Sequence, residues 1–201
     1  MKRIPLIPTL VVALCVAAMI ALGVWQLQRK AWKDALLASY AANIHASEIA
    51  FPRFPDQSAL FRPSGGFCLE PTSFDLEGAG KAGYRVIAHC RTGAEGPGML
   101  VQLGTTHDPA YKPHWKGGAV SGFISHAPTH RSLIGEVVHP EPQPLLLVAD
   151  VPPPGLAANG EPDLRSVPNN HLSYAVQWFL FAAIALMIYI LALRRRWRSD
   201  G

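Results

Sequence analysis

A histidine beside two flat aromatic side chains stands at the start of the last apolar segment of the chain. His171 follows Pro168-Asn169-Asn170 and precedes Tyr174 and Trp178. Steps of three and four residues place such side chains on one side of a helix. The full stripe comprises His171, Tyr174, Ala175, Trp178, Ala182, Ala185 and Tyr189. An imidazole in this setting could ligate a metal ion or the iron of a planar cofactor, with the aromatic rings as apolar walls.

The same residues also suit a purely structural role. Asn169 or Asn170 would cap the helix, and Pro168 would turn the chain into it. The aromatic side chains would anchor the helix where lipid meets water, and the small residues would let a second helix approach closely. Composition alone favours this structural role, because interfacial aromatic residues are common and metal ligands are rare.

The segment that carries the stripe is long enough to cross a membrane. No charged residue occurs from Leu172 to Leu193, which as a helix extends about 33 Å. The basic cluster Arg194 to Arg198 follows, and Lys and Arg beside a span favour the cytoplasmic side. We therefore expect a motif and membrane helix over 168–193 and a cytoplasmic basic tail over 194–201.

A second apolar segment lies near the N-terminus. Residues 4–28 are uncharged and follow Lys2 and Arg3. This pattern is shared by an uncleaved membrane span and a secretory signal peptide. The length of the apolar run favours an uncleaved membrane helix over 4–28. No mitochondrial presequence is recognised, so we expect a bacterial inner membrane.

Aromatic and basic residues continue beyond the first span at helical spacings. Trp25, Arg29 and Lys33 fall on one face, as expected for a juxtamembrane helix over 29–42 whose rings and cations lie at headgroup depth. The alternative is a simple anchoring collar. Six cationic residues at the termini (Lys2, Arg3, Arg194, Arg195, Arg196 and Arg198) oppose four on the intervening segment (Arg29, Lys30, Lys33 and Arg165). This difference predicts that both termini are cytoplasmic.

The region between the spans, residues 43–167, is predicted to be one periplasmic β-rich domain. Gly and Pro interrupt it repeatedly, and short apolar runs separate the breaks. The predicted strands are Gly66–Asp75, Gly83–Arg91, Met99–Leu103, Ala119–Ser125, Leu133–Val138 and Leu145–Val151. The fold class expected is a membrane protein in which two transmembrane α-helices flank one mostly antiparallel β domain, either an open sheet or a small barrel.

The remaining reactive residues give little evidence of catalysis. The spacing of Cys68 and Cys90 leaves open whether they form a disulfide. The eight histidines are dispersed, which is typical of surface residues, and motifs for nucleophilic or metal-dependent hydrolysis are missing. The net charge of +4 lies mainly beside the spans and indicates contact with lipid rather than nucleic acid. We expect a protein that is not an enzyme.

Two motifs resemble those of a known family. Pro168-Asn169-Asn170-His171-Leu172, with Tyr174-Ala175 and Trp178-Phe179, is similar to the C-terminal motif of the SURF1 family. Leu22-Gly23-Val24-Trp25-Gln26-Leu27, with Arg29, Trp32 and Lys33, is similar to its N-terminal motif. The middle of the chain matches less well, since Met99–Thr105 lacks the Arg-Gly-Trp sequence of the family.

The resemblance implies an assembly factor for a haem-copper cytochrome c oxidase that assists delivery of haem a to the catalytic subunit. The cofactor expected is transiently bound haem, and the partners expected are that subunit, factors for haem a synthesis or insertion, and membrane lipid. The residues proposed to contact haem are His171 as iron ligand, Tyr174, Trp178 and Trp25 as walls, and Arg29 and Lys33 beside the propionates. The alternative is a structural scaffold or accessory subunit of the oxidase without cofactor.

Overall fold

The computed structural model describes residues 4–94, 97–129, 142–164 and 167–199. The chain forms two compact units, one of residues 1–37 with 165–201 and one of residues 38–164. The first contains two long apolar helices and the second a mixed β-sheet. The predicted fold class is therefore confirmed.

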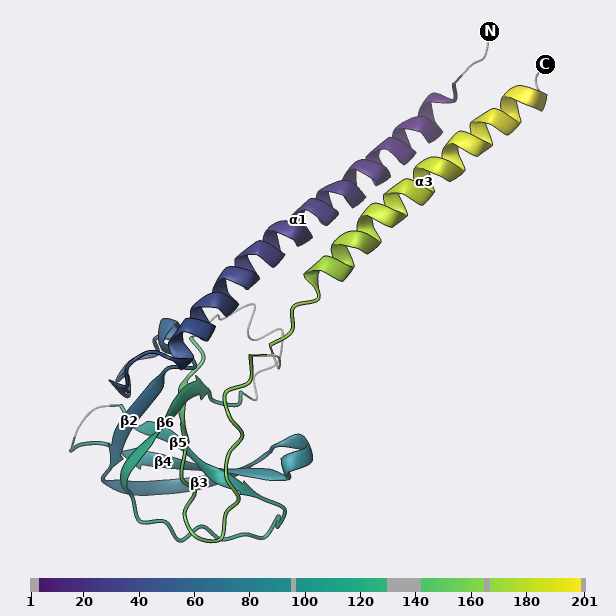
Figure 1. Cartoon of the computed structure of the whole chain (residues 1–201). Coiled ribbons are helices and arrows are strands. Elements are labelled where there is room, and N and C mark those ends of the chain that lie inside the picture. Colours follow the sequence, from purple (N-terminus) through teal and green to yellow (C-terminus); the bar gives the residue numbers. More distant parts are fainter. Residues whose placement is uncertain (1–3, 95–96, 130–141, 165–166, 200–201) are drawn as a thin grey trace. The chain divides into compact units, whose positions relative to one another are not determined.

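Two helices make up the first unit. Helix α1 spans Leu6–Ile44 and continues into the second unit, and helix α3 spans His171–Ser199. Both are long and apolar enough to cross a membrane. Within the first unit they run side by side in opposite directions (Figure 1). The apolar run from Leu6 onward and the helical spacings through Lys33 belong to one continuous helix.

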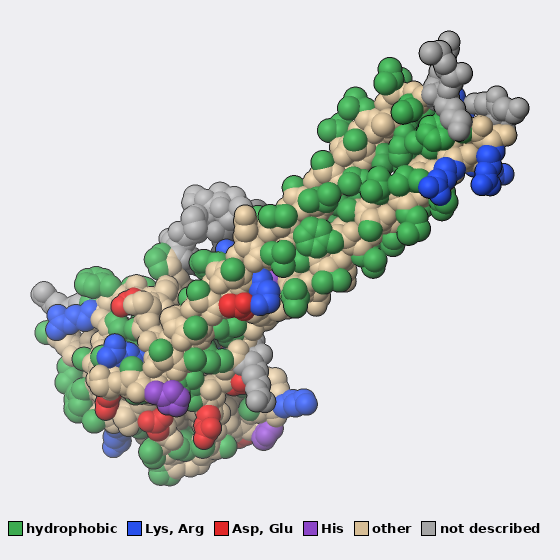
Figure 2. Space-filling view, turned by 45° about the horizontal axis from the view of Figure 1, so that its top comes forward, with side chains coloured by type: hydrophobic (Ala, Val, Ile, Leu, Met, Phe, Trp, Pro, Cys, Tyr) green, Lys and Arg blue, Asp and Glu red, His purple; other side chains and the backbone are tan. Residues whose placement is uncertain are grey.

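The helices meet along stripes of less exposed residues. On α1 this stripe recurs every three or four residues through Val12, Val16, Met19, Gly23 and Gln26. On α3 the most deeply buried side chains are Ala175, 1% exposed, and Ala182, 5% exposed. Small residues at these points allow the close approach that drives association of helices in lipid. Large apolar side chains point outward, and Figure 2 shows them over the visible face of the pair.

The second unit is built on a seven-stranded sheet. Its strands are β1 Ile49–Ala50, β2 Pro63–Cys68, β3 Glu70–Gly78, β4 Tyr84–Arg91, β5 Met99–Thr106, β6 Gly118–His126 and β7 Leu145–Ala149. Their order is β1-β2-β6-β7-β5-β4-β3. The β1–β2 and β5–β7 pairs are parallel, and the other four pairs are antiparallel. The sheet is thus mostly antiparallel, as predicted.

The sheet curls so that strands distant in its order come together. Only Leu69 separates β2 from β3, although these strands are second and last in the order. Cys68 of β2 and Cys90 of β4 form a disulfide with 5.2 Å between their Cα atoms. These links bring the two ends of the sheet close together, as in the small barrel that the sequence allows.

One predicted strand differs from the structure, and another lies outside the described residues. The expected single strand Gly66–Asp75 is wrong, because the chain changes strand at Leu69 and forms β2 and β3 instead. The predicted strand Leu133–Val138 lies outside the described residues. The core of the sheet is aliphatic and contains Val86, Val101, Leu103, Ile124 and Leu147, each at most 1% exposed.

The last turns of α1 are fixed to the sheet domain. The ring of Tyr40 lies 5.0 Å from that of Phe61. The side-chain nitrogen Nδ2 of Asn43 donates to the carbonyl oxygens of Ser58 and Leu60 at 2.7 and 2.8 Å. Helix α1 therefore ends as part of the second unit.

Candidate functional site

Residues of the two sequence motifs meet between helices α1 and α3. Nδ1 of His171 lies 2.8 Å from Oε1 of Gln26, so a side chain of the C-terminal motif contacts one of the N-terminal motif. An amide oxygen only accepts hydrogen bonds, so Nδ1 carries the hydrogen in this pair. The lone pair of the imidazole is then on Nε2, which is the atom able to ligate a metal.

A second contact between the motifs leaves no room for a Cβ atom unless an aromatic ring moves. Gly23 lies against Phe179, and a Cβ atom added to Gly23 would come within 2.6 Å of the phenyl ring. Glycine at this position thus lets the ring of α3 rest on the backbone of α1. Together with the Gln26–His171 pair, which lies three residues away on α1 and eight residues away on α3, this contact sets how the two helices are aligned along their length.

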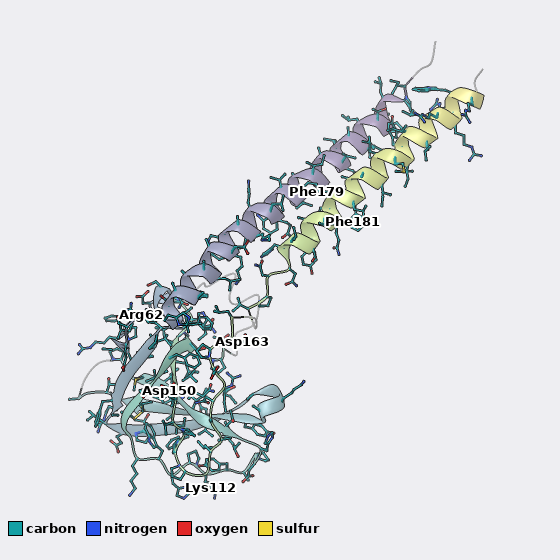
Figure 3. All side chains as sticks on the ribbon, in the orientation of Figure 1. Arg62, Lys112, Asp150, Asp163, Phe179 and Phe181 are labelled. Atoms are coloured by element: carbon teal, nitrogen blue, oxygen red, sulfur yellow. A yellow bond between two sulfur atoms is a disulfide. The ribbon has the colours of Figure 1, made fainter. Side chains whose placement is uncertain are left out.

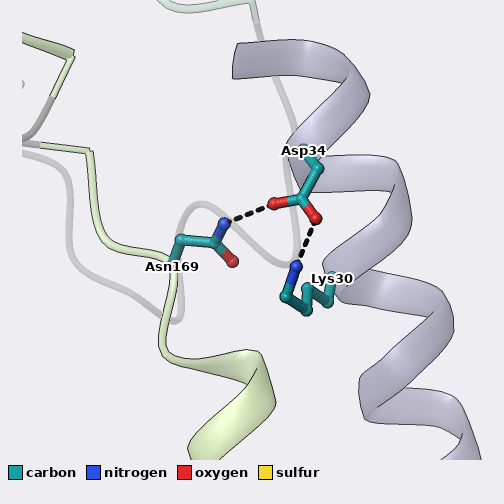
Figure 4. Close-up of polar contacts among 3 residues, drawn as sticks. All are labelled: Lys30, Asp34 and Asn169. Atoms are coloured by element: carbon teal, nitrogen blue, oxygen red, sulfur yellow. Dashed lines mark hydrogen bonds and ion pairs between the residues drawn. The ribbon is translucent and has the colours of Figure 1, made fainter. Parts of the chain in front are cut away.

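A polar cluster lies at the end of the pair where α3 begins. The amide nitrogen of Asn169 donates to Oδ1 of Asp34 at 2.8 Å, and Lys30 binds the other carboxylate oxygen (Figure 4). The sequence makes Asn169 a candidate helix cap, but its side-chain nitrogen instead crosses to α1. The carboxylate of Asp34 accepts from Lys30 of α1 and from Asn169, and so connects the segment preceding His171 to α1.

The other residues proposed from the sequence lie around this interior. Trp178 is half-buried and makes an edge-to-face contact with Phe181, at a centroid distance of 6.3 Å. Tyr174 is 48% exposed and therefore lies off the buried stripe to which its spacing had assigned it. Trp25 is 53% exposed. Figure 3 labels Phe179 and Phe181, which lie next to Trp178 in the sequence of α3.

The two predicted cations have different surroundings. Arg29 is exposed, and its guanidinium carbon lies 4.0 Å from the centroid of the Trp32 ring, a cation–π contact. Lys33 is half-buried one turn beyond Arg29 along α1. Among the described residues, Arg29 contacts an aromatic ring and forms no ion pair with an acidic group.

Helical geometry places several of these residues on one flank of the pair. Trp25 and Arg29 are rotated to the same side of the stripe through Gly23 and Gln26. Because α3 runs in the opposite direction, Tyr174 is rotated to that same side of its own stripe. The Gly23–Phe179 and Gln26–His171 contacts set Trp25 and Tyr174 at similar heights. The flank thus presents Tyr174 next to His171, with Arg29 on the same side and Trp25 turned farther outward.

Three contributors were missed when the sequence was considered alone. Gln26, Gly23 and Asp34 had no assigned role, although Gln26 and Gly23 stand inside the N-terminal motif. Polar residues within apolar helices are costly unless paired, which is the signal that could have singled out Gln26. A metal site made of three or more His, Cys, Asp or Glu side chains is not found among the described residues.

These features define a class of protein with two membrane-type helices, motif residues between them, and a curled sheet domain inserted in sequence. The SURF1 family model matches residues 13–183, so the chain belongs to the SURF1 family, a family of cytochrome oxidase assembly factors rather than enzymes. A similar protein is a SURF1-like protein of Monosiga brevicollis, 23% identical over 226 aligned positions that cover 90% of this chain and 85% of the relative.

Proposed function

We propose that the helix pair handles haem a during assembly of a haem-copper cytochrome c oxidase, with His171 as the iron ligand. The observation that carries this proposal is the Gln26–His171 hydrogen bond. It orients the imidazole and leaves the lone pair of Nε2 free to bind iron, the arrangement that commonly supports a histidine ligand. Bound haem would supply the iron that the imidazole ligates.

The residues on the flank suit a flat apolar cofactor with acidic groups. Trp25 and Tyr174 offer exposed aromatic surface, and Arg29 and Lys33 offer positive charge for propionates. The interior between the helices does not suit a porphyrin, because Ala175 and Ala182 are buried at the contact. Haem would therefore lie against the flank. Trp178, whose ring contacts that of Phe181, would be a further aromatic neighbour of the cofactor.

Substitution of His171 tests the ligand directly. The full chain is purified in detergent from cells that make haem a, and its absorbance spectrum is recorded. His171→Ala is expected to lose bound haem at unchanged protein abundance, because the apolar span stays intact. Arg29→Ala should weaken binding less, since an exposed charge is screened by water and salt. His126→Ala in the sheet domain is the control and should bind like the parent.

A second candidate function is a scaffold that packs on oxidase helices without a cofactor. The observation in its favour is the long run of exposed apolar side chains on α1 and α3. The same experiment separates the two functions. A His171→Ala protein with the parent's haem content and spectrum would refute ligation and leave the scaffold.

The proposed location is a bacterial inner membrane with the sheet domain in the periplasm. The six-to-four distribution of flanking cations supports cytoplasmic termini. The Cys68–Cys90 disulfide suits an oxidising compartment such as the periplasm. Alkaline phosphatase fused after Ser125 should be active, and phosphatase fused after Gly201 should be silent. The reverse pattern would overturn this topology.

A further inference from the structure

A cleft within the sheet domain is lined by aromatic, proline and basic residues. Its volume is about 550 Å³, within the usual range for small-molecule sites. Leu103 of β5 is buried at its base, and Tyr111, Trp115 and Leu156 add apolar surface. A neighbouring cavity of about 430 Å³ shares Leu103 and Trp115 with it. The two cavities therefore form a continuous apolar groove beside β5.

Backbone and side-chain hydrogen bonds hold one wall of this cleft in place. The segment after β7 pairs with β5 through Thr105 and Ala157, whose amides donate to each other's carbonyls at 3.0 and 2.8 Å. The side-chain nitrogen Nδ2 of Asn159 donates to the carbonyls of Gln102 and Ala149 at 3.1 and 2.8 Å. This wall is therefore formed before any ligand binds.

The opposite wall is the loop between β5 and β6. It begins with a tight turn in which Asp108 accepts a hydrogen bond from the amide of Ala110 at 2.8 Å. Farther along, Tyr111 and Trp115 pack against the sheet core. The same packing joins Leu156 of the first wall to that core. Both walls thus rest on one aliphatic base.

The ionisable side chains that line the cleft are mainly basic. Lys112, His114 and Lys116 line it, and its described lining contains no acidic residue. Lys112, labelled in Figure 3, and Lys116 are both exposed. The nearby carboxylate of Asp108 is engaged with its own turn. Two ammonium groups beside aromatic side chains would attract an anion that also carries an apolar body.

We propose that this cleft binds a small amphipathic anion, with its apolar body on Trp115 and Tyr111 and its acidic head between Lys112 and Lys116. The site is separate from His171 in the sequence and does not depend on haem binding. Two sources have this chemistry, namely a small aromatic acid and a short fatty acid.

Fluorine NMR of the full chain in non-ionic detergent tests the proposal. The five tryptophans are labelled as 5-fluorotryptophan, and Trp115→Phe identifies the resonance of the cleft. Titration with 2-naphthoate should shift the Trp115 resonance with saturation, while the resonances of Trp25, Trp32, Trp178 and Trp197 stay in place. Octanoate is the second probe, and a shift with one probe only identifies the source of the ligand.

Matched controls test the role of charge. The Lys112→Gln/Lys116→Gln protein should bind the effective probe about 3- to 10-fold more weakly, since exposed charges contribute modestly. Lys81→Gln, far along the chain in a different turn, should bind like the parent. The neutral amide of 2-naphthoate should bind as weakly to the parent as the acid does to the double variant. Absence of a saturable Trp115 shift with both acids, or equal binding by the double variant, would overturn the proposal.

Discussion

The two units of the protein are stabilised in different ways. The sheet domain buries large aliphatic side chains such as Leu60, Leu103 and Ile124 and adds a disulfide. The helix pair buries Ala175 and Ala182 and turns its large apolar side chains outward. In the sheet domain, removal of aliphatic surface from water drives burial. In lipid that drive is missing, so close approach and paired polar groups must hold the helices together. The residues of the two motifs are those that make such contacts.

The largest effect is expected from filling a close contact in the sheet. A Cβ atom added to Gly122 of β6 would lie 1.8 Å from the carbonyl oxygen of Val148, and backbone cannot easily move. Gly122→Ala should cost about 3 kcal/mol or more. Thermal denaturation of the full chain measures this loss. Gly160→Ala, where the added atom meets open space, should have almost no effect, and equal stability of the two variants would contradict the prediction.

Removing the disulfide should be the next most damaging change. Cys68 and Cys90 are separated by 22 positions, and a loop of that size gives about 3 kcal/mol of stabilisation in the chain-entropy description. The Cys68→Ser/Cys90→Ser protein should therefore melt at a lower temperature than the parent. Cys15→Ser, in α1, provides the matched control and should leave the melting of the sheet domain unchanged.

Enlarging Gly23 tests the helix pair by the same principle. Gly23→Leu should weaken helix association by about 1–3 kcal/mol, because the new side chain meets the ring of Phe179. The readout is cross-linking by a short bismaleimide between Thr9→Cys and Tyr189→Cys, whose parent side chains are in contact. Cys15 is replaced by Ala throughout. Adding Phe179→Ala should restore cross-linking, and failure of this rescue would show that the two residues do not meet.

The smallest effect concerns His126 and pH. Partial burial lowers the pKa of His126 below its ordinary value of 6.5. The unfolded chain therefore binds a proton near pH 6.5, while the folded chain remains neutral to lower pH. Stability of the sheet domain should fall as the pH drops from about 6.5 towards the folded pKa, by less than about 1 kcal/mol.

Replacement of the histidine provides the check. His126→Gln should flatten this part of the stability profile, as measured by thermal melts from pH 7.5 to 5. A profile as steep as that of the parent would assign the pH dependence to other groups.

The helices and most strands could be predicted because apolar periodicity and Gly or Pro breaks report local structure. Runs such as Tyr84–Arg91 alternate clearly and form a strand within one residue of the expected limits. The change of strand at Leu69 was missed because one apolar residue in an apolar run carries no signal of a turn. Parallel pairing of β5 with β7 depends on distant segments and is equally invisible locally.

The candidate site was predictable in its residue types but not in its contacts. His171 and Gln26 are 145 positions apart, and only the register of two antiparallel helices brings them to 2.8 Å. Tyr174 illustrates the limit of spacing, since positions 174 and 175 are both compatible with the stripe but only Ala175 is buried. The disulfide likewise depended on curling of the sheet, which the positions of Cys68 and Cys90 do not reveal.

The position of β7 in the sheet affects how the chain can be made. This strand is the last to be synthesised, yet it lies between β6 and β5 and joins the β1-β2-β6 half to the β5-β4-β3 half. Until the ribosome releases Leu145–Ala149, both halves carry an unpaired inner edge that could pair wrongly with another nascent chain. Only 21 residues separate the end of β7 from the start of α3 at His171. Completion of the sheet and insertion of the second helix are therefore nearly simultaneous events in biogenesis.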